Sequence, residues 1–172
     1  MGKNNEIEIN EQLIKKDLEK FIDTFGKTLA SKVADKSVAD AKAVLEEFYL
    51  DYQPRYYNRT FDLLNNSYHR YYKNHTTTFY GGVILSSKRM RDYKNTPKQD
   101  VFNWTILDGY HGYNWYKGAD GERVIDPITS RPPISKLMER IYDKPSFEQL
   151  KKEALKEAEK GNYKTLRFKK EN

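Results

Sequence analysis

The chain has 172 residues and no cysteine, 37% of its residues are hydrophobic, and its formal net charge is +6. This length and apolar content suit a single modest core, and the lack of cysteine excludes disulfides and thiolate metal sites. Because the first ten residues are polar and acidic and no apolar run approaches ~20 residues, we expect neither a secretory signal nor a membrane span.

The first part of the chain is expected to be helical. Apolar residues recur there every three or four positions, which predicts a helix near 10–25 that Gly26 interrupts. A second stripe with the same spacing predicts a longer amphipathic helix at about 34–51. Pro54 ends this helix, because proline disfavours the helical conformation in the residue before it.

Tyrosine is concentrated in the segment that follows. Eight of the 14 tyrosines lie between residues 49 and 80, and residues 51–100 hold nine Lys and Arg against four Asp and Glu. Such a mixture could stack bases and bind phosphates of a single-stranded nucleic acid. Tyrosine and arginine are also enriched at protein interfaces. Because aliphatic residues are few, we favour a subunit interface over nucleic-acid binding.

The middle of the chain is predicted to hold a strand. Residues 76–86 are rich in β-branched and aromatic side chains, and the pair Gly81-Gly82 indicates a bulge or a close backbone approach. The basic run 88–98 is typical of a solvated surface, with contact to DNA as the less favoured alternative. Residues 101–107 could form either a short helix or a short strand.

Residues 108–134 are punctuated by glycine and proline, which predicts a long irregular loop. Loops of this length inside one domain are uncommon, and they usually bind a ligand or wrap around a neighbouring subunit. We therefore interpret this segment as a candidate arm between subunits.

The end of the chain is predicted to contain two helices and a strand. A short helix is expected at 135–142, and the capping box 146–149 opens a last helix that runs to Lys160. Gly161 ends this helix, and the alternation of side chains over 163–168 indicates a short edge strand.

These elements predict one α+β domain over residues 1–172. In it, long N-terminal amphipathic helices pack on a small, mostly antiparallel sheet, with long loops and a C-terminal helix. Residues 1–9 are expected to be flexible.

Few residues have the pattern of a catalytic or metal site. Three histidines are present, and none stands in a metal-binding motif. Asp108 and His111 are close in sequence, but Gly109 and Gly112 favour a loop in which His111 bonds to the backbone. There is no cysteine and no nucleophile elbow. We expect no enzyme activity, metal or cofactor, and a metal-dependent nuclease that uses Asp108 and His111 is the least favoured alternative.

The order of several motifs resembles a known family. A long helix is followed by Pro-Arg-Tyr-Tyr-Asn-Arg-Thr-Phe-Asp-Leu-Leu-Asn over 54–65, by Tyr-Gly-Gly-Val over 80–83, by Trp104 and by Gly-Tyr-His-Gly over 109–112. This order, over about residues 25–142, resembles the tail-completion or head–tail joining (neck) proteins of long-tailed bacteriophages. Phe61 departs from the family pattern, which commonly has glycine at that place.

The resemblance implies a ring-forming virion subunit without enzyme activity, assembled in the host cytoplasm. Its partners would be further copies of the chain, the head-connector or head-completion proteins, and the tail-terminator or tail-tube proteins, with no membrane contact. The motif residues that the resemblance assigns to subunit contacts are Pro54, Arg55, Tyr56, Tyr57, Arg59, Thr60, Leu63, Gly81, Gly82, Trp104, Gly109, His111 and Gly112. Candidates for sequence-blind contact with genomic DNA in the ring lumen are Lys88, Arg89, Arg91, Lys94 and Lys98.

Within the motifs, chemistry suggests individual roles. Arg55 and Arg59 could make bidentate contacts to carboxylates, and Leu63, Val83 and Trp104 are expected in the core. The glycines would permit backbone conformations closed to other residues. The alternative to the ring subunit is a basic nucleic-acid-binding module.

Overall fold

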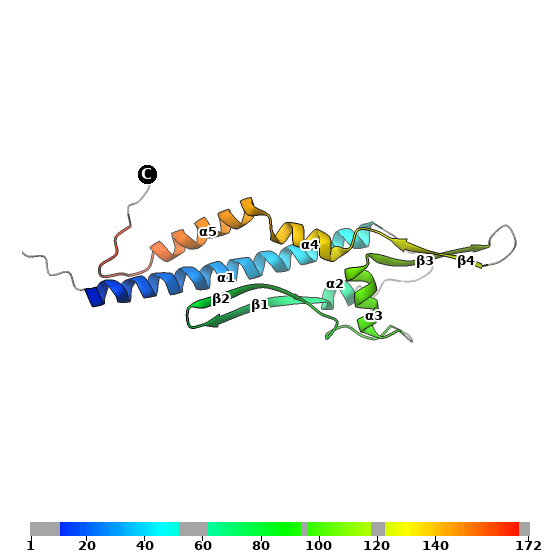
Figure 1. Cartoon of the computed structure of the whole chain (residues 1–172), viewed down its shortest axis with the longest axis horizontal. Coiled ribbons are helices and arrows are strands. Elements are labelled where there is room, and N and C mark those ends of the chain that lie inside the picture. Colours follow the sequence, from blue (N-terminus) through cyan, green and yellow to red (C-terminus); the bar gives the residue numbers. More distant parts are fainter. Residues whose placement is uncertain (1–10, 52–61, 94–95, 118–122, 169–172) are drawn as a thin grey trace, which may run out of the picture.

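The computed structural model describes residues 11–51, 62–93, 96–117 and 123–168. The spine of the elongated molecule is the helix α1, with α4 and α5 along one side and the β1–β2 hairpin along the other (Figure 1). This arrangement confirms the α+β fold class. The elements in chain order are α1 (Glu11–Leu50), α2 (Asp62–Asn66), β1 (Tyr68–His75), β2 (Thr78–Leu85), α3 (Lys98–Phe102), the π-helical η1 (Asn103–Leu107), β3 (Tyr110–Lys117), β4 (Arg123–Thr129), α4 (Pro133–Ile141) and α5 (Lys144–Glu159).

The helix α1 is continuous over 40 residues, so the predicted interruption at Gly26 is wrong. Gly26 lies under the ring of Phe79, and a Cβ at position 26 would be 2.2 Å from Cδ2 of that ring. The glycine therefore makes room for a side chain of β2 on the surface of the helix. Packing of this kind outweighs the cost of about 1 kcal/mol that glycine imposes inside a helix.

The β1–β2 hairpin is antiparallel, and its register runs without a break from Tyr68 opposite Leu85 to His75 opposite Thr78. The predicted strand 76–86 is thus confirmed in large part as β2, whereas its partner β1 was not predicted. Gly81 marks a close backbone approach, because a Cβ there would be 1.8 Å from the carbonyl oxygen of Ala30 in α1. No bulge occurs at this point.

The hydrophobic core lies between α1 and the elements on its two sides. One cluster joins α1 to α2, α3, η1 and the loop after β2, and another joins α1 to α4. The first cluster contains Leu45, Leu63, Met90, Phe102 and Ile106, and the second contains Ala41, Val44 and Leu137.

Two of the three predicted core residues are confirmed. Leu63 is buried, and Val83 is half-buried against the second cluster. Trp104 is 46% exposed, so its predicted core position is wrong. Residues 98–107 are helical, and Phe102 and Ile106 face the core, which leaves Trp104 on the opposite side of the turn.

The prediction of an irregular loop over 108–134 is wrong for most of that segment. The strands β3 and β4 pair in antiparallel fashion, with Trp115 opposite Ile125. This hairpin, which we call the arm, extends beyond the end of α1 (Figure 1). A register shift between Tyr110 and Gly112 places His111 in a bulge.

Gly109 lies at the base of the arm and has the left-handed backbone conformation that favours glycine, with φ at +68°. A Cβ at this position would be 2.1 Å from the carbonyl oxygen of Ser130. The predicted conformational role of glycine is therefore confirmed at this position.

The predicted capping box over 146–149 is wrong, because α5 begins three residues earlier. Asp143 is the N-cap residue, and its Oδ2 accepts a hydrogen bond from the backbone N–H of Ser146 at 3.1 Å. The side-chain hydroxyl of Ser146 donates to the same oxygen.

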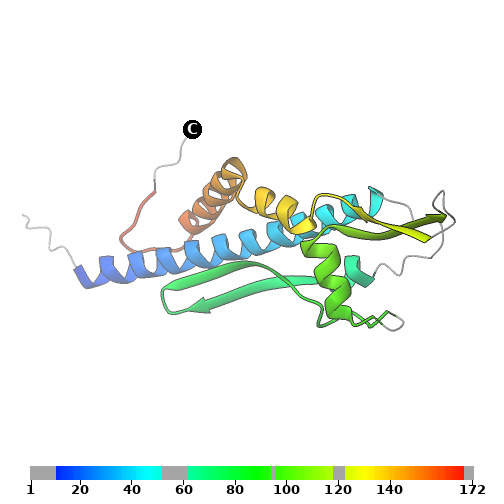
Figure 2. The ribbon, with the colours of Figure 1, turned by 45° about the vertical axis from the view of Figure 1, so that its right-hand side comes forward.

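The predicted edge strand over 163–168 is also wrong. This segment, which we call the tail clasp, is irregular and lies against the beginning of α1 (Figure 2). Thr165 donates from its backbone N–H and from Oγ1 to Oδ2 of Asp17, at 2.6 and 2.8 Å. The ring of Phe21 contacts the rings of Tyr163 and Phe168. Bonds to a helix side chain thus replace the strand pairing that the alternation predicted.

Candidate interaction surfaces

Six of the motif residues lie outside the described part of the chain, and so does Lys94. The remaining motif residues are distributed over the core, β2, η1 and the base of the arm. Leu63 belongs to α2 and lies in the core, and only the backbone of His111 and Gly112 is described. The six undescribed residues are Pro54, Arg55, Tyr56, Tyr57, Arg59 and Thr60.

The side of the β1–β2 hairpin that packs on α1 is set by specific contacts. Phe79 and Gly81 of β2 touch the helix backbone, and Arg70 of β1 donates from Nε to Oδ1 of Asp35 at 2.6 Å. Arg70 also donates to the hydroxyl of Ser31 at 2.7 Å. These contacts fix which face of the hairpin points toward the helix.

The opposite face of the hairpin is not covered by any other element that the structure describes. Successive residues of a strand alternate between the two faces, and directly paired residues share a face. The residues out of phase with Arg70 and Gly81 therefore point away from α1. This set, which we call the hairpin outer face, consists of His69, Tyr71, Lys73, His75, Thr78, Tyr80, Gly82 and Ile84.

The hairpin outer face is aromatic and basic, and none of its eight residues is acidic. Tyr71 is 37% exposed and Tyr80 is 47% exposed. The register places Tyr71 opposite Gly82 and Lys73 opposite Tyr80, so the two tyrosines are diagonal neighbours. Within the described residues, Lys73 forms no ion pair.

Gly82 leaves open space on this face where another residue would have a side chain, and we call this space the notch. No heavy atom lies within 4 Å of the place that a Cβ would take at this position. The notch is bordered on β2 by Tyr80 and Ile84 and across the ladder by Tyr71. Unlike Gly81, this glycine is not required by packing against α1.

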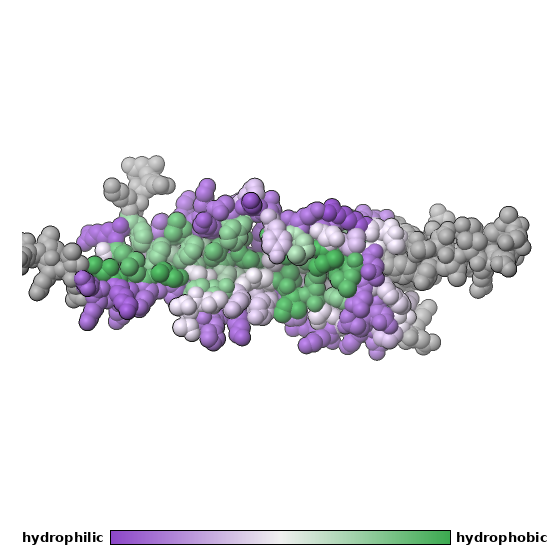
Figure 3. Space-filling view, viewed as in Figure 1, coloured by the Kyte–Doolittle hydropathy of each residue, from purple (hydrophilic) through white to green (hydrophobic). Residues whose placement is uncertain are grey.

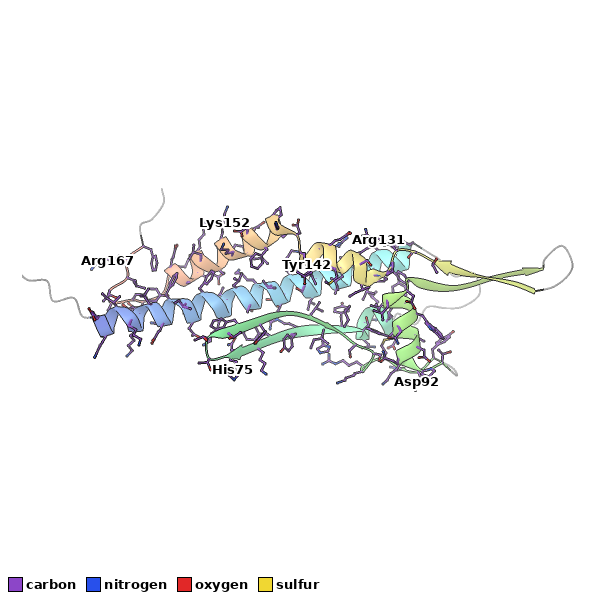
Figure 4. The ribbon with its side chains drawn as sticks, viewed as in Figure 1. His75, Asp92, Arg131, Tyr142, Lys152 and Arg167 are labelled. Carbon is purple, nitrogen blue, oxygen red and sulfur yellow. The ribbon has the colours of Figure 1, made fainter. Side chains whose placement is uncertain are left out.

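The described residues before α3 in the basic run, 88–93 and 96–97, continue from β2 on the same side of the molecule. Figure 4 places His75 at one end of this side and Asp92 at the other. Lys88, Arg89 and Arg91 are exposed, and the backbone N–H of Arg91 donates to Oδ2 of Asp62 at 2.7 Å. The exposed basic side chains thus extend the positive charge beyond the hairpin.

The proposed DNA contact Lys98 is held in the same loop. Its Nζ donates to the carbonyl oxygen of Lys88 at 3.3 Å, and its backbone N–H donates to Oδ1 of Asp92 at 2.9 Å. Lys98 therefore stabilises the loop from within, at the start of α3.

A second uncovered surface lies on the first half of α1. Leu18 and Ile22 are 43% and 55% exposed and stand one helical turn apart, next to the half-buried Ile14 and Phe25. We call these four residues the apolar strip. Figure 3 shows the corresponding hydrophobic stretch along the beginning of the helix. Exposed apolar side chains grouped in this way indicate a contact surface.

The arm is a third candidate surface. The strands β3 and β4 form a separate two-stranded sheet, and their principal contact with the other described elements is with η1. An isolated two-stranded hairpin is only marginally stable in water, and both of its edges carry backbone groups open to further pairing. The arm is therefore suited to being covered by another chain.

Two ionisable groups with shifted pKa values, Lys32 and Tyr68, lie where elements of the fold pack together. A hydrogen bond from Lys32 to Glu157 raises the pKa of that lysine, whose Nζ lies 2.9 Å from Glu157 and 3.3 Å from Glu153. These pairs connect α1 to α5. Burial raises the pKa of the Tyr68 phenol, which keeps it neutral beside the core.

Groups of three or more His, Asp or Glu side chains that could hold a metal ion do not occur among the residues that the structure describes. The side chain of His111 lies outside those residues, so its expected hydrogen bond to the backbone stays a prediction, as does the less favoured alternative in which it acts with Asp108. In the same described ranges, no helix has both the length and the apolar character that crossing a membrane requires.

Comparison with known proteins gives one match. The family model described as YomN matches residues 10–160, which is most of the chain. No curated protein and no solved structure matches it significantly.

Proposed function

The chain belongs to the YomN family, which is phage-associated, and from this premise we propose that it is a structural subunit of the neck of a tailed phage. In this proposal the subunits form a ring between the head connector and the tail, and the role of the protein is adhesion without catalysis. The observation that carries the proposal is the arm, a two-stranded hairpin that extends from the body and, among the described elements, contacts it chiefly at η1.

A closed ring needs two different surfaces on each subunit, because the contact between neighbours is heterologous. The arm and the apolar strip meet this requirement. They lie at opposite ends of α1, so the arm of one copy can reach the strip of the next in a head-to-tail arrangement (Figure 2). The aromatic and β-branched composition of β3 and β4 suits such a contact.

The faces that remain would contact other components of the particle. We propose a head-connector or head-completion protein on one rim of the ring and a tail-terminator or tail-tube protein on the other. The loop that carries Lys88, Arg89 and Arg91 would line the lumen, where exposed cations attract the phosphates of a passing genome without reading its sequence.

The proposal is tested by locating the chain in purified particles. An antibody raised against the chain and detected with gold should label the junction of head and tail. Label on the capsid wall or along the tail, or particles without the chain when the lysate contains it, would overturn the neck assignment.

A second experiment tests the arm. In a variant, residues 112–127 are replaced by a short Gly-Ser turn, and the oligomeric state of the full chain and of this variant is measured by light scattering. We expect the full chain to form a closed oligomer at high concentration and the variant to stay monomeric. Equal oligomers from both proteins would contradict the role of the arm.

A further inference from the structure

We propose that the hairpin outer face binds single-stranded nucleic acid, with Tyr71 and Tyr80 stacking on bases and Lys73 contacting the backbone. This site is separate from the arm and the apolar strip, and the inference does not depend on a position in the neck. It rests on the geometry of β1 and β2, which is described for every residue of the face.

The two tyrosines form a stacking platform. They are diagonal neighbours across the antiparallel ladder, on the side of the hairpin that faces away from α1. Aromatic rings exposed on a sheet face stack with bases of any sequence, because every base has a π-face. Two rings at this spacing can accept two bases of an extended strand.

The notch at Gly82, which lies opposite Tyr71 and next to Tyr80 on the same face, adds space for a base. Since nothing lies within 4 Å of the Cβ position, a flat ring could approach the backbone of β2 there. Close approach of a ligand to the backbone is one of the reasons for glycine inside a strand. Packing on α1 explains why residue 81 is glycine, and a bound base would explain why residue 82 is glycine as well.

The charge of the face favours a nucleic acid over a protein partner. Lys73 stands directly opposite Tyr80, and His69 and His75 lie toward the two ends of β1. The nearest acidic partner of this hairpin, Asp35, is on the inner side, where it pairs with Arg70. The outer face thus offers the ammonium group of Lys73 without a carboxylate, and the exposed basic side chains after β2 extend this positive charge along a backbone.

A single strand fits better than a duplex. In a duplex the bases are stacked on one another, so their faces are closed to tyrosine. Each strand of the hairpin has eight residues, so the hairpin outer face is about 26 Å long at the usual rise of a strand. This length suits a few nucleotides.

The test uses the full chain and a fluorescein-labelled oligo(dT) of 15 nucleotides at low salt, with binding followed by fluorescence anisotropy. We expect binding that is at least tenfold tighter than to a duplex of the same length. We also expect the affinity to fall with salt, with a log–log slope of about −0.7 for each phosphate contacted. No binding at low salt, or equal binding to the duplex, would overturn the proposal.

Three variants assign the binding to this face. Gly82→Val fills the notch without touching α1, and the double variant Tyr71→Leu, Tyr80→Leu removes the platform; each should weaken binding roughly tenfold or more. Lys73→Gln should lower the salt slope by about 0.7. The matched control is Tyr142→Leu, which removes an exposed tyrosine of the α4–α5 junction and should leave binding unchanged.

Circular dichroism on each variant separates lost binding from lost folding. Folded variants that bind like the unchanged protein would overturn the site, because the basic loop alone would then account for the affinity. Weakened binding in the Tyr142→Leu control to the same degree would overturn it as well. A negative result here leaves the position of the chain in phage particles untouched, so the two proposals fail separately.

Discussion

The backbone of Gly81 in β2 presses directly on the carbonyl group of Ala30 in α1. The distance of 1.8 Å between that oxygen and a Cβ built at position 81 leaves no room for a side chain. This contact brings the sheet as close to the helix as two backbones allow, and it fixes the side of the hairpin that stays uncovered.

Gly81→Ala should therefore lower the free energy of unfolding by about 3 kcal/mol, because the new methyl group forces the hairpin away from the helix. Urea unfolding followed by circular dichroism measures the effect. The neighbouring Gly82→Ala is the control, and it should change the stability by less than about 1 kcal/mol, since its methyl group enters open space. Equal effects from both changes would show that the hairpin does not pack on α1 through Gly81.

Gly109→Ala should weaken the base of the arm. Its φ of +68° is costly for alanine, and the methyl group would meet the carbonyl oxygen of Ser130, whose N–H bonds to the Gly109 carbonyl at 2.8 Å. We expect faster hydrogen exchange in β3 and β4 with little change in α1. Unchanged exchange in the arm would contradict this role of Gly109.

The tail clasp should open in acid. The hydrogen bond from the backbone N–H of Thr165 is the main cause that holds the pKa of Asp17 below its ordinary value. A group with a lowered pKa stabilises the folded state above its unfolded pKa, and this stabilisation is lost as the pH falls below about 4. Lys20 also holds the segment before the tail clasp, because its Nζ donates to the carbonyl oxygen of Asn162 at 2.9 Å.

Hydrogen exchange of the Thr165 amide measures the clasp. Protection should be complete at neutral pH and should decline below pH ~4. Asp17→Asn should show weak protection at every pH, because the neutral amide is a poorer acceptor. Full protection in Asp17→Asn would show that the ring contacts of Phe21 hold the tail without the carboxylate.

Asp143→Ala should destabilise α5. The hydrogen bonds that Ser146 donates lower the pKa of Asp143, as expected for an N-cap carboxylate at the positive end of a helix. Removing the cap should lower the Tm by about 2–4 °C in a chain of this size. Differential scanning calorimetry measures the change, and Ser146→Ala, which keeps the carboxylate and the backbone bond, should give a smaller shift.

Leu18→Gln and Ile22→Gln together should reduce self-association without loss of stability. Both side chains are about half exposed, so their replacement removes little of the core and much of the apolar strip. Light scattering against protein concentration measures association. An unchanged oligomer would exclude the strip from the contact between copies.

Periodicity predicted most residues of α1 and α5 as helical, because apolar residues recur there every three or four positions. The prediction failed at Gly26, where we expected the helix to be interrupted. The free-energy cost of glycine inside a helix is offset there by packing of the ring of Phe79, a residue more than fifty positions away. Periodicity failed also at β1, whose inner face carries Arg70 rather than an aliphatic residue. The helix supplies the partner of that arginine through Asp35, and no pattern within β1 indicates such a pairing.

The candidate sites could be predicted only in outline. Composition drew attention to the tyrosines of residues 49–80, but the register decides that Tyr71 and Tyr80 are outward while Tyr68 lies beside the core. The sequence drew attention to the pair Gly81-Gly82. That Gly81 packs on α1 while Gly82 faces open space could be seen only in the structure. We expected the segment of the arm to be a loop that contacts a neighbouring subunit. Its strands were not predicted, because glycine and the Asp-Pro pair of β4 are unfavourable in strands.

The unbroken course of α1 also has a mechanical consequence. Forty residues at about 1.5 Å each make a strut of roughly 60 Å, with the tail clasp at one end and the arm at the other. The two ends are therefore far enough apart to contact two different molecules at once. In any assembly of copies joined end to end, the length of α1 would set the repeat distance between copies.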